Sequence, residues 1–194
     1  MKIFTAFMLL CVSAACYGQQ KERHWAVPDH YKTQFAGNIG FISAGAGHLH
    51  AKDKMETDLF LGYLPKSVGG DHIFSLSSKT TFFPWTLQRS DNIMIRPLSL
   101  GAYLTYSFGS QFDTLLPNEY PDGYYWWATS LRFGMYAGGT VGKRFEGKVL
   151  SAVHAYYELS TYDLKFISYV QNSDALSIPD IFSLALGLKF EFAY

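Results

Sequence analysis

Apolar and polar residues alternate along much of the chain with a period of two. In the last segment, apolar residues occupy every second position from Leu184 to Tyr194, and Lys189 and Glu191 stand between them. Successive side chains of a β-strand point to opposite faces, so this pattern predicts a strand with one apolar face and one small or charged face. The same division recurs upstream in runs of about ten to fifteen residues, against the usual five or six of soluble sheets.

The alternating runs are separated by Gly, Pro, Asn and Asp, and together they predict eight strands. These are residues 33–45, 53–64, 72–84, 93–108, 125–138, 147–160, 162–171 and 179–194. A soluble sandwich also alternates, but here the charges lie on the small-residue face, as in a polar lumen, and the runs reach the roughly 9–11 residues that cross a bilayer. We therefore predict an all-β fold, a closed antiparallel up-and-down transmembrane β-barrel of eight strands.

The strand count leaves one conflict, which concerns the long segment 109–124. Counted back from a last strand that ends in the periplasm, this segment falls on the periplasmic side, whereas long loops are normally extracellular. If 162–171 were part of an outer loop, 109–124 would move outside. Another strand would then have to come from residues 25–31, where Pro28 disfavours a central strand. We keep the eight strands above.

The N-terminus predicts export. Lys2 is followed by an apolar run over 3–15 and by small residues up to Gly18. This is the pattern of a secretory signal peptide, and the run is too short to span a bilayer. We predict cleavage after Gly18, so that residues 1–18 are the leader, 19–32 a short N-terminal segment and 33–194 the barrel domain. In a second interpretation, Ser13-Ala14-Ala15-Cys16 resembles a lipoprotein lipobox, which implies lipidation of Cys16, although Leu is usual where Ser13 stands.

Composition narrows the class of protein. Sixteen basic and sixteen acidic residues give no net charge, so nothing favours nucleic acid or strongly anionic lipid as a partner. Aromatic residues make up 18% of the chain, with fourteen Tyr, and Tyr and Trp prefer membrane–water interfaces. Both cysteines, Cys11 and Cys16, lie in the predicted leader, so we expect no disulfide in the mature chain. After the leader, no apolar run is long enough for a transmembrane helix.

The C-terminus carries a resemblance to a known family. Gly187-Leu188-Lys189-Phe190-Glu191-Phe192-Ala193-Tyr194 resembles the β-signal of outer-membrane β-barrel proteins, with the motif on Gly187, Leu188, Phe190, Phe192 and Tyr194. In that family, the barrel-assembly machinery reads the motif. With the leader and the long alternating runs, the chain resembles small barrel proteins of Bacteroidetes-type bacteria. The resemblance implies a location in the outer membrane, with membrane lipid and the assembly machinery as partners.

The alternation also predicts which charges face the lumen. They are Glu56, Asp58, Lys79, Arg132, His154, Glu158, Lys189 and Glu191. Because the interior of an eight-stranded barrel is just wide enough for side chains, and unpaired buried charges are costly, we expect these residues to form a structural network. A proton relay or a small pore is the alternative. Within the network, we expect Arg132 to be held by carboxylates, with Glu158 as the first candidate.

Candidate catalytic residues, if the barrel is an enzyme, are His154, Glu158 and Ser130. Outer-membrane lipid A deacylases resemble this chain in compartment and barrel class, and their pattern places a Ser two residues from a His. Here the residues two away from His154 are Ala152 and Tyr156, so that pattern is missing and we assign no catalytic residue.

Two further motifs have ordinary interpretations. His48 and His50 could begin a metal site, but no further ligand can be named, so we predict a solvated turn, no metal and no cofactor. In segment 121–127, Pro-Asp-Gly predicts a turn and the four aromatic residues after it an interfacial girdle, with a sugar-binding patch as the alternative.

We therefore expect an integral outer-membrane barrel with a structural or envelope-associated role and no catalytic site. The alternatives are a lipid-acting enzyme of the lipid A deacylase or acyltransferase class, and a barrel whose outer loops bind a ligand. The oligomeric state stays open.

Overall fold

The computed structural model describes residues 24, 26–109, 112, 130–147 and 149–193. Several predicted features lie outside these residues: the leader over 1–18 with the lipidation site at Cys16, the aromatic segment 121–127, and Tyr194 of the β-signal. Everything below concerns the described part of the chain.

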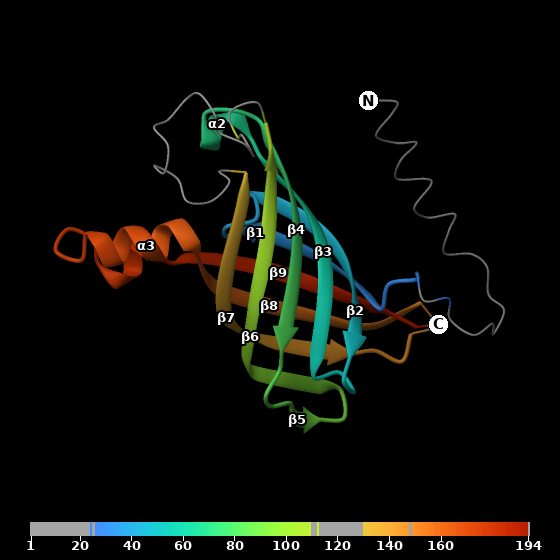
Figure 1. The fold of residues 1–194 in the computed structure, drawn as a ribbon. Coiled ribbons are helices and arrows are strands. Elements are labelled where there is room, and N and C mark those ends of the chain that lie inside the picture. The colour runs from blue at the N-terminus through green and yellow to red at the C-terminus, as the bar shows by residue number, and fades with distance from the viewer. Residues whose placement is uncertain (1–23, 25, 110–111, 113–129, 148, 194) are drawn as a thin grey trace, which may run out of the picture.

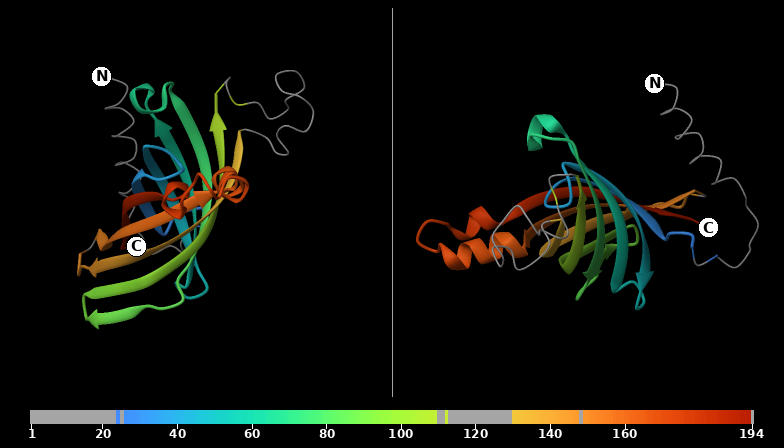
Figure 2. Two further views of the ribbon diagram at one scale, coloured as in Figure 1. Left: turned by 90° about the vertical axis from the view of Figure 1, so that its left-hand side faces the viewer. Right: turned by 45° about the horizontal axis from the view of Figure 1, so that its top comes forward.

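Eight antiparallel strands close into a barrel (Figures 1 and 2). Neighbours along the chain pair in turn, and the ring closes because the first strand pairs with the last. The strands are β1 (His30–Ala36), β2 (Ile42–His50), β3 (Met55–Leu64), β4 (Ile73–Phe82), β6 (Ile93–Phe108), β7 (Leu131–Arg144), β8 (Leu150–Tyr162) and β9 (Ser183–Phe192). A short additional strand, β5 (Leu87–Ser90), pairs with the start of β6 outside the ring. The predicted closed antiparallel barrel of eight strands is confirmed.

Two of the predicted strands were wrong, and the two errors cancel in the count. The run 33–45 is not one strand, because the chain turns back between Ala36 and Ile42. Ala36 and Gly37 adopt left-handed backbone angles, with φ of 59° and 85°, which reverse the chain and separate β1 from β2. The barrel therefore begins at His30, after Pro28, and not at residue 33.

The run 162–171 is helix α3 (Asp163–Gln171) and not a strand. A strand here would need a free partner edge, but β9 already pairs with β8 on one side and β1 on the other. The backbone groups of this segment are satisfied within a helix instead. A 3₁₀ turn, η1 (Ile178–Ile181), then leads into β9.

These corrections place the connection from β8 to β9, which holds α3 and η1, at one end of the barrel, which we call the loop end. Helix α2 (Lys66–Gly69) also lies there, and β6 ends and β7 begins at this end (Figure 1). The opposite, terminal end holds the start of β1, the end of β9 and β5. The segment 109–124, whose side the strand count left in conflict, lies mostly outside the described residues. None of the helices in the described residues is long and apolar enough to cross a bilayer.

The polarity of the barrel wall is the reverse of that of a soluble protein. On β9, Leu184, Leu186 and Leu188 point outward and are 52%, 53% and 43% exposed, while Ala185 between them and Lys189 after them are buried. The same arrangement holds around the ring. Other large apolar residues that are at least 40% exposed on the strands are Tyr31, Phe35, Ile42, Leu59, Leu61, Phe74, Phe82, Leu100, Leu104, Phe108, Phe133, Met135, Val141, Tyr157 and Leu159.

Inside the barrel, tyrosine rings cover glycines on neighbouring strands. A Cβ atom added at Gly187 would lie 2.2 Å from Cζ of Tyr156, and one added at Gly134 would lie 2.1 Å from Cζ of Tyr103. Both hydroxyl groups donate to backbone carbonyl oxygens, that of Tyr156 to Thr33 at 3.3 Å and that of Tyr103 to Thr161 at 3.2 Å. The rings are therefore held flat against the wall, and the glycines make room for them.

We expect Gly187→Val to destabilise the barrel by about 1–3 kcal/mol, because the added side chain displaces the ring of Tyr156 from a filled interior. Unfolding by urea, followed by tryptophan fluorescence, measures the loss. Adding Tyr156→Ala should recover part of it, since the small side chain vacates the space. If the double variant is as unstable as the sum of the two single variants, the ring is not the cause.

Candidate functional site

Charged side chains from six strands fill the barrel interior. The buried ones are His30, Lys32, Glu56, Asp58, Lys79, Arg96, His154, Glu158 and Lys189. They are inward because the strands alternate, and each belongs to the face that also carries small residues. Glu191, also on the inward face of β9, is half-buried near the terminal end.

Seven of these residues form one connected group, which we call the basal cluster. Its members are His30, Lys32, Glu56, Asp58, His154, Lys189 and Glu191. All lie in the half of the barrel toward the terminal end, at the start of β1, β3 and β8 and the end of β9.

Asp58 joins β3 to β1 within the basal cluster. Its Oδ1 atom lies 2.6 Å from Nε2 of His30, and its Oδ2 atom accepts a hydrogen bond of 2.6 Å from Nζ of Lys32. Both partners come from β1, two residues apart and therefore on one face. The carboxylate is thus fully paired and is not available to a substrate.

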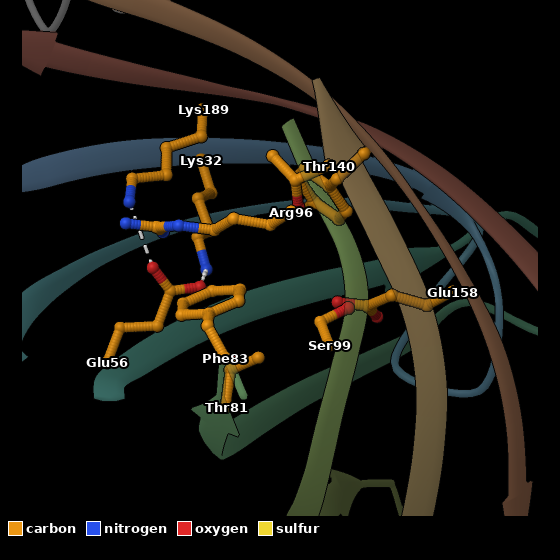
Figure 3. Close-up of a pocket in the computed structure, with 10 residues that line it drawn as sticks. Lys32, Glu56, Thr81, Phe83, Arg96, Ser99, Thr140, Glu158 and Lys189 are labelled. Carbon is orange, nitrogen blue, oxygen red and sulfur yellow. Dashed lines mark hydrogen bonds and ion pairs between the residues drawn. The ribbon is translucent and has the colours of Figure 1, made fainter. Parts of the chain in front are cut away.

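Glu56 extends the cluster across the lumen. Its Oε1 atom accepts a hydrogen bond from Lys32, and its Oε2 atom accepts one of 2.9 Å from Nζ of Lys189 on β9 (Figure 3). Lys189 in turn lies 3.0 Å from Oε1 of Glu191. Nε2 of His154 on β8 lies 3.2 Å from the same Glu191 oxygen, at an angle outside that of a hydrogen bond.

A second ion pair lies closer to the middle of the barrel. Nζ of Lys79 donates to Oε2 of Glu158 at 2.5 Å and to Oε1 of Gln34 at 3.0 Å. The same ammonium group lies 4.5 Å from the ring centroid of Tyr136 and 5.1 Å from that of Phe60. Aromatic faces attract a cation, so the two rings add to the attraction exerted by the carboxylate of Glu158.

Arg96 closes the terminal end of the lumen. Its guanidinium lies 4.1 Å from the ring centroid of Phe83, and Nη2 donates to the backbone oxygen of Asp53 at 3.2 Å. Asp53 belongs to the β2–β3 turn, where three successive residues from Ala51 adopt left-handed angles. Arg96 therefore links the wall of the barrel to the turn that caps it.

The interior has little free space. A cavity lined by residues of both ion-pair groups and by Arg96 (Figure 3) has a volume of about 10 Å³. That is room for about one water molecule. A larger solute at this level would have to displace ion pairs.

The lumen charges balance. Four cations, Lys32, Lys79, Arg96 and Lys189, face four carboxylates, Glu56, Asp58, Glu158 and Glu191. Each carboxylate contacts at least one lysine. These pairs join strands that are far apart in the sequence.

The residues predicted to face the lumen fall into two groups. Glu56, Asp58, Lys79, His154, Glu158, Lys189 and Glu191 lie in the network just described. Arg132 lies near the loop end instead, with Nη1 3.9 Å from Oδ2 of Asp163 at the start of α3.

The expected pair between Arg132 and Glu158 does not form. Glu158 is opposite Gly138 on β7, six residues from Arg132 and thus about 20 Å away along the strand. The hairpin turns at 145–149, later than expected, because the Gly138–Gly139 pair continues the strand beside Tyr157 and does not turn.

We expect the losses of unfolding free energy caused by Arg132→Met and Glu158→Leu to add within about 0.3–0.5 kcal/mol in a double-mutant cycle. Strong coupling measured by urea unfolding would contradict this register.

Sequence reasoning missed His30, Lys32, Gln34 and Arg96. The first three lie on β1, which begins within the predicted 19–32 segment. Arg96 is missed because β6 has a bulge between Arg96 and Ser99, so that both residues point inward although they are three apart. Pro97 within this stretch is the available signal, since proline in a strand marks an edge or a bulge.

The candidate catalytic residues do not meet. Ser130 precedes β7 at the loop end, while His154 is opposite Gly142, twelve residues further along and roughly 40 Å away. Glu158 is engaged by Lys79. The geometry therefore supplies no nucleophile for His154 among these candidates.

His48 and His50 lie at the terminal end of β2. Nδ1 of His48 is 3.5 Å from Oδ2 of Asp29, and the side chain of His50 is exposed. Among the described residues, no three His, Cys, Asp or Glu side chains are grouped as metal ligands.

No family model, curated protein or solved structure matches this chain at a significant level.

Proposed function

We propose that this chain is an integral outer-membrane β-barrel whose lumen is sealed by ion pairs and whose role is structural or envelope-associated. The observation that carries this proposal is the reversed polarity: charges are buried and large apolar side chains are exposed. In water, such a wall would leave a broad apolar surface wet, whereas hydrocarbon solvates it favourably.

The dimensions of the wall support the membrane assignment. Strands such as β3, β4 and β9 have ten residues each, within the roughly 9–11 that cross the hydrocarbon when tilted. Closure leaves no unpaired edge in the ring, which a bilayer requires because it offers no hydrogen-bond partners.

The distribution of connections supports an orientation. Among the described residues the longest connection, from β8 to β9, lies at one end, and both termini of the barrel lie at the other. Outer-membrane barrels have short periplasmic turns and longer extracellular loops, so we assign the loop end to the cell exterior. The predicted leader and β-signal agree with export and with assembly by the barrel-assembly machinery, and lipid is then the main partner.

Fractionation tests the location. The full chain, expressed in a Gram-negative host, should sediment with outer membranes and resist extraction by carbonate and urea. On a detergent gel, unheated and boiled samples should migrate differently, because closed barrels resist unfolding in detergent. Recovery from the soluble periplasm would overturn the membrane assignment.

Dye retention tests the sealed lumen. Lipid vesicles that contain the folded protein should retain a small trapped dye as well as protein-free vesicles do, with an open porin as the positive control. Release at the rate of the porin would show that the lumen conducts, and the structural role would then be wrong.

A further inference from the structure

Helix α3 is the largest described feature outside the barrel ring. It follows β8 directly and extends away from the loop end, and the chain then returns through η1 to β9 (Figures 1 and 2). At nine residues, the helix is too short to be stable in water without tertiary support. The stability of the helix therefore depends on what its two sides contact.

The charged residues of α3 are turned toward the barrel. Oδ2 of Asp163 lies 3.9 Å from Nη1 of Arg132, and this carboxylate is only 15% exposed. Nζ of Lys165 donates to Oγ of Ser183 at 2.8 Å and lies 5.5 Å from the ring centroid of Tyr162. The helix contains no other charged residue, so its outer side has none.

The outer side of the helix is apolar. Phe166 and Val170 are four residues apart and so share one face, and they are 55% and 62% exposed. Asp163 is three residues from Phe166 and begins the same face, but its carboxylate is directed to Arg132 where the helix joins the barrel. Lys165 lies on the opposite side of the helix and contacts Ser183 and Tyr162.

The apolar surface of the hairpin continues that of the barrel. Ile178 of η1 and Phe182 after it are 59% and 42% exposed, and Leu184 and Leu186 follow along the outward face of β9. Polar residues gather at the tip of the hairpin, where Asp174 is exposed. At the return, Ser177 donates to Asp180 through both its hydroxyl and its backbone N–H, which keeps the pKa of Asp180 below its usual value and fixes the start of η1.

We propose that α3 and η1 form an interfacial anchor, which inserts its apolar side between the lipids of the leaflet at the loop end. This inference rests on the proposed membrane location and adds a binding surface to it. The occupant is lipid because the surface is continuous with the apolar barrel wall and because the helix keeps its charges on the barrel side. Amphipathic helices that lie in the membrane interface bury their apolar face near the boundary between headgroups and acyl chains.

Depth-dependent quenching tests the anchor. Single cysteines at Val170, Leu186 and Asp174 are labelled with an environment-sensitive dye, in protein that lacks other cysteines and is folded into vesicles with quencher-bearing acyl chains. We expect strong quenching at Leu186 on the barrel wall, clear quenching at Val170, and several-fold weaker quenching at Asp174. Aqueous iodide should quench the three labels in the opposite order.

The three labels separate the anchor from the barrel proposal. If Leu186 is quenched by lipid but Val170 behaves like Asp174, the anchor is wrong and the membrane barrel stands. If Leu186 is not quenched either, the membrane location itself is wrong. Protection of Val170 that depends on protein concentration, without lipid quenching, would assign the surface to a second copy of the chain and overturn the anchor. A heat-dependent shift on a detergent gel verifies that each labelled variant is folded.

Discussion

Lys79→Met and Glu158→Leu, made one at a time, are each expected to destabilise the barrel by about 3–5 kcal/mol, because each leaves a buried charge without its partner. The two side chains are 2% and 8% exposed, and their charged atoms are 2.5 Å apart. Together, the two substitutions should cost less than either alone, since apolar side chains of similar size then fill the site beside the rings of Phe60 and Tyr136.

Urea unfolding in detergent micelles measures the stability of the unchanged protein, the two single variants and the double variant. Glu146→Leu is the matched control, because Glu146 is an exposed carboxylate in the β7–β8 connection and its replacement should change stability by no more than about 0.5 kcal/mol. If the losses at Lys79 and Glu158 simply add, the two residues do not interact, and the ion pairs do not brace the barrel.

Leu186→Arg is expected to destabilise the barrel in lipid vesicles by about 2–4 kcal/mol, because it places a charge near the middle of the hydrocarbon. Leu186 is 53% exposed on the outward face of β9 and lies near the centre of that strand. The same change at Phe182, which precedes the strand at the loop end, should cost only about 0–1 kcal/mol, because an arginine there reaches the headgroups.

Equilibrium unfolding in vesicles compares the two arginine variants, with Leu186→Ala as the control for lost side-chain volume. The difference between depths is the diagnostic quantity, because a solvent-exposed sheet would tolerate arginine equally at both positions. Equal and small losses at Leu186 and Phe182 would show that the outward face does not meet hydrocarbon.

The lumen charges have the composition of a binding site but not its geometry. A binding or catalytic site needs unpaired groups beside a space that the ligand can occupy. Here Glu56 and Asp58 are both occupied by lysine, and the neighbouring cavity holds about one water molecule.

Local pattern was enough to assign most strand faces. The alternation over 184–192 predicts that Lys189 points inward and Leu188 outward, as the structure shows. The same pattern misled over 162–171, where Leu164, Phe166 and Val170 fall on alternate positions, as in a strand, but belong to the helix α3. It also failed to show the turn at Ala36 and Gly37, which divides one alternating run into β1 and β2.

The partners of the lumen charges could not be predicted from the sequence. A strand register depends on where each turn falls, and a shift of the β7–β8 turn to 145–149 moved Arg132 from Glu158 to Asp163. Lys79 and Glu158 are 79 residues apart and meet only because the ring closes. Arg96 points inward because of a bulge that interrupts the period of two.

The sequence by itself determined the β class and the face on which most charges lie, because alternation follows from the geometry of a single extended backbone. Only the tertiary structure decided which edges pair, where the loops gather and which carboxylate meets which lysine. Those choices depend on hydrogen bonding between distant segments: pairing of β1 with β9 leaves no edge for a further strand, so the segment between β8 and β9 becomes the helix α3.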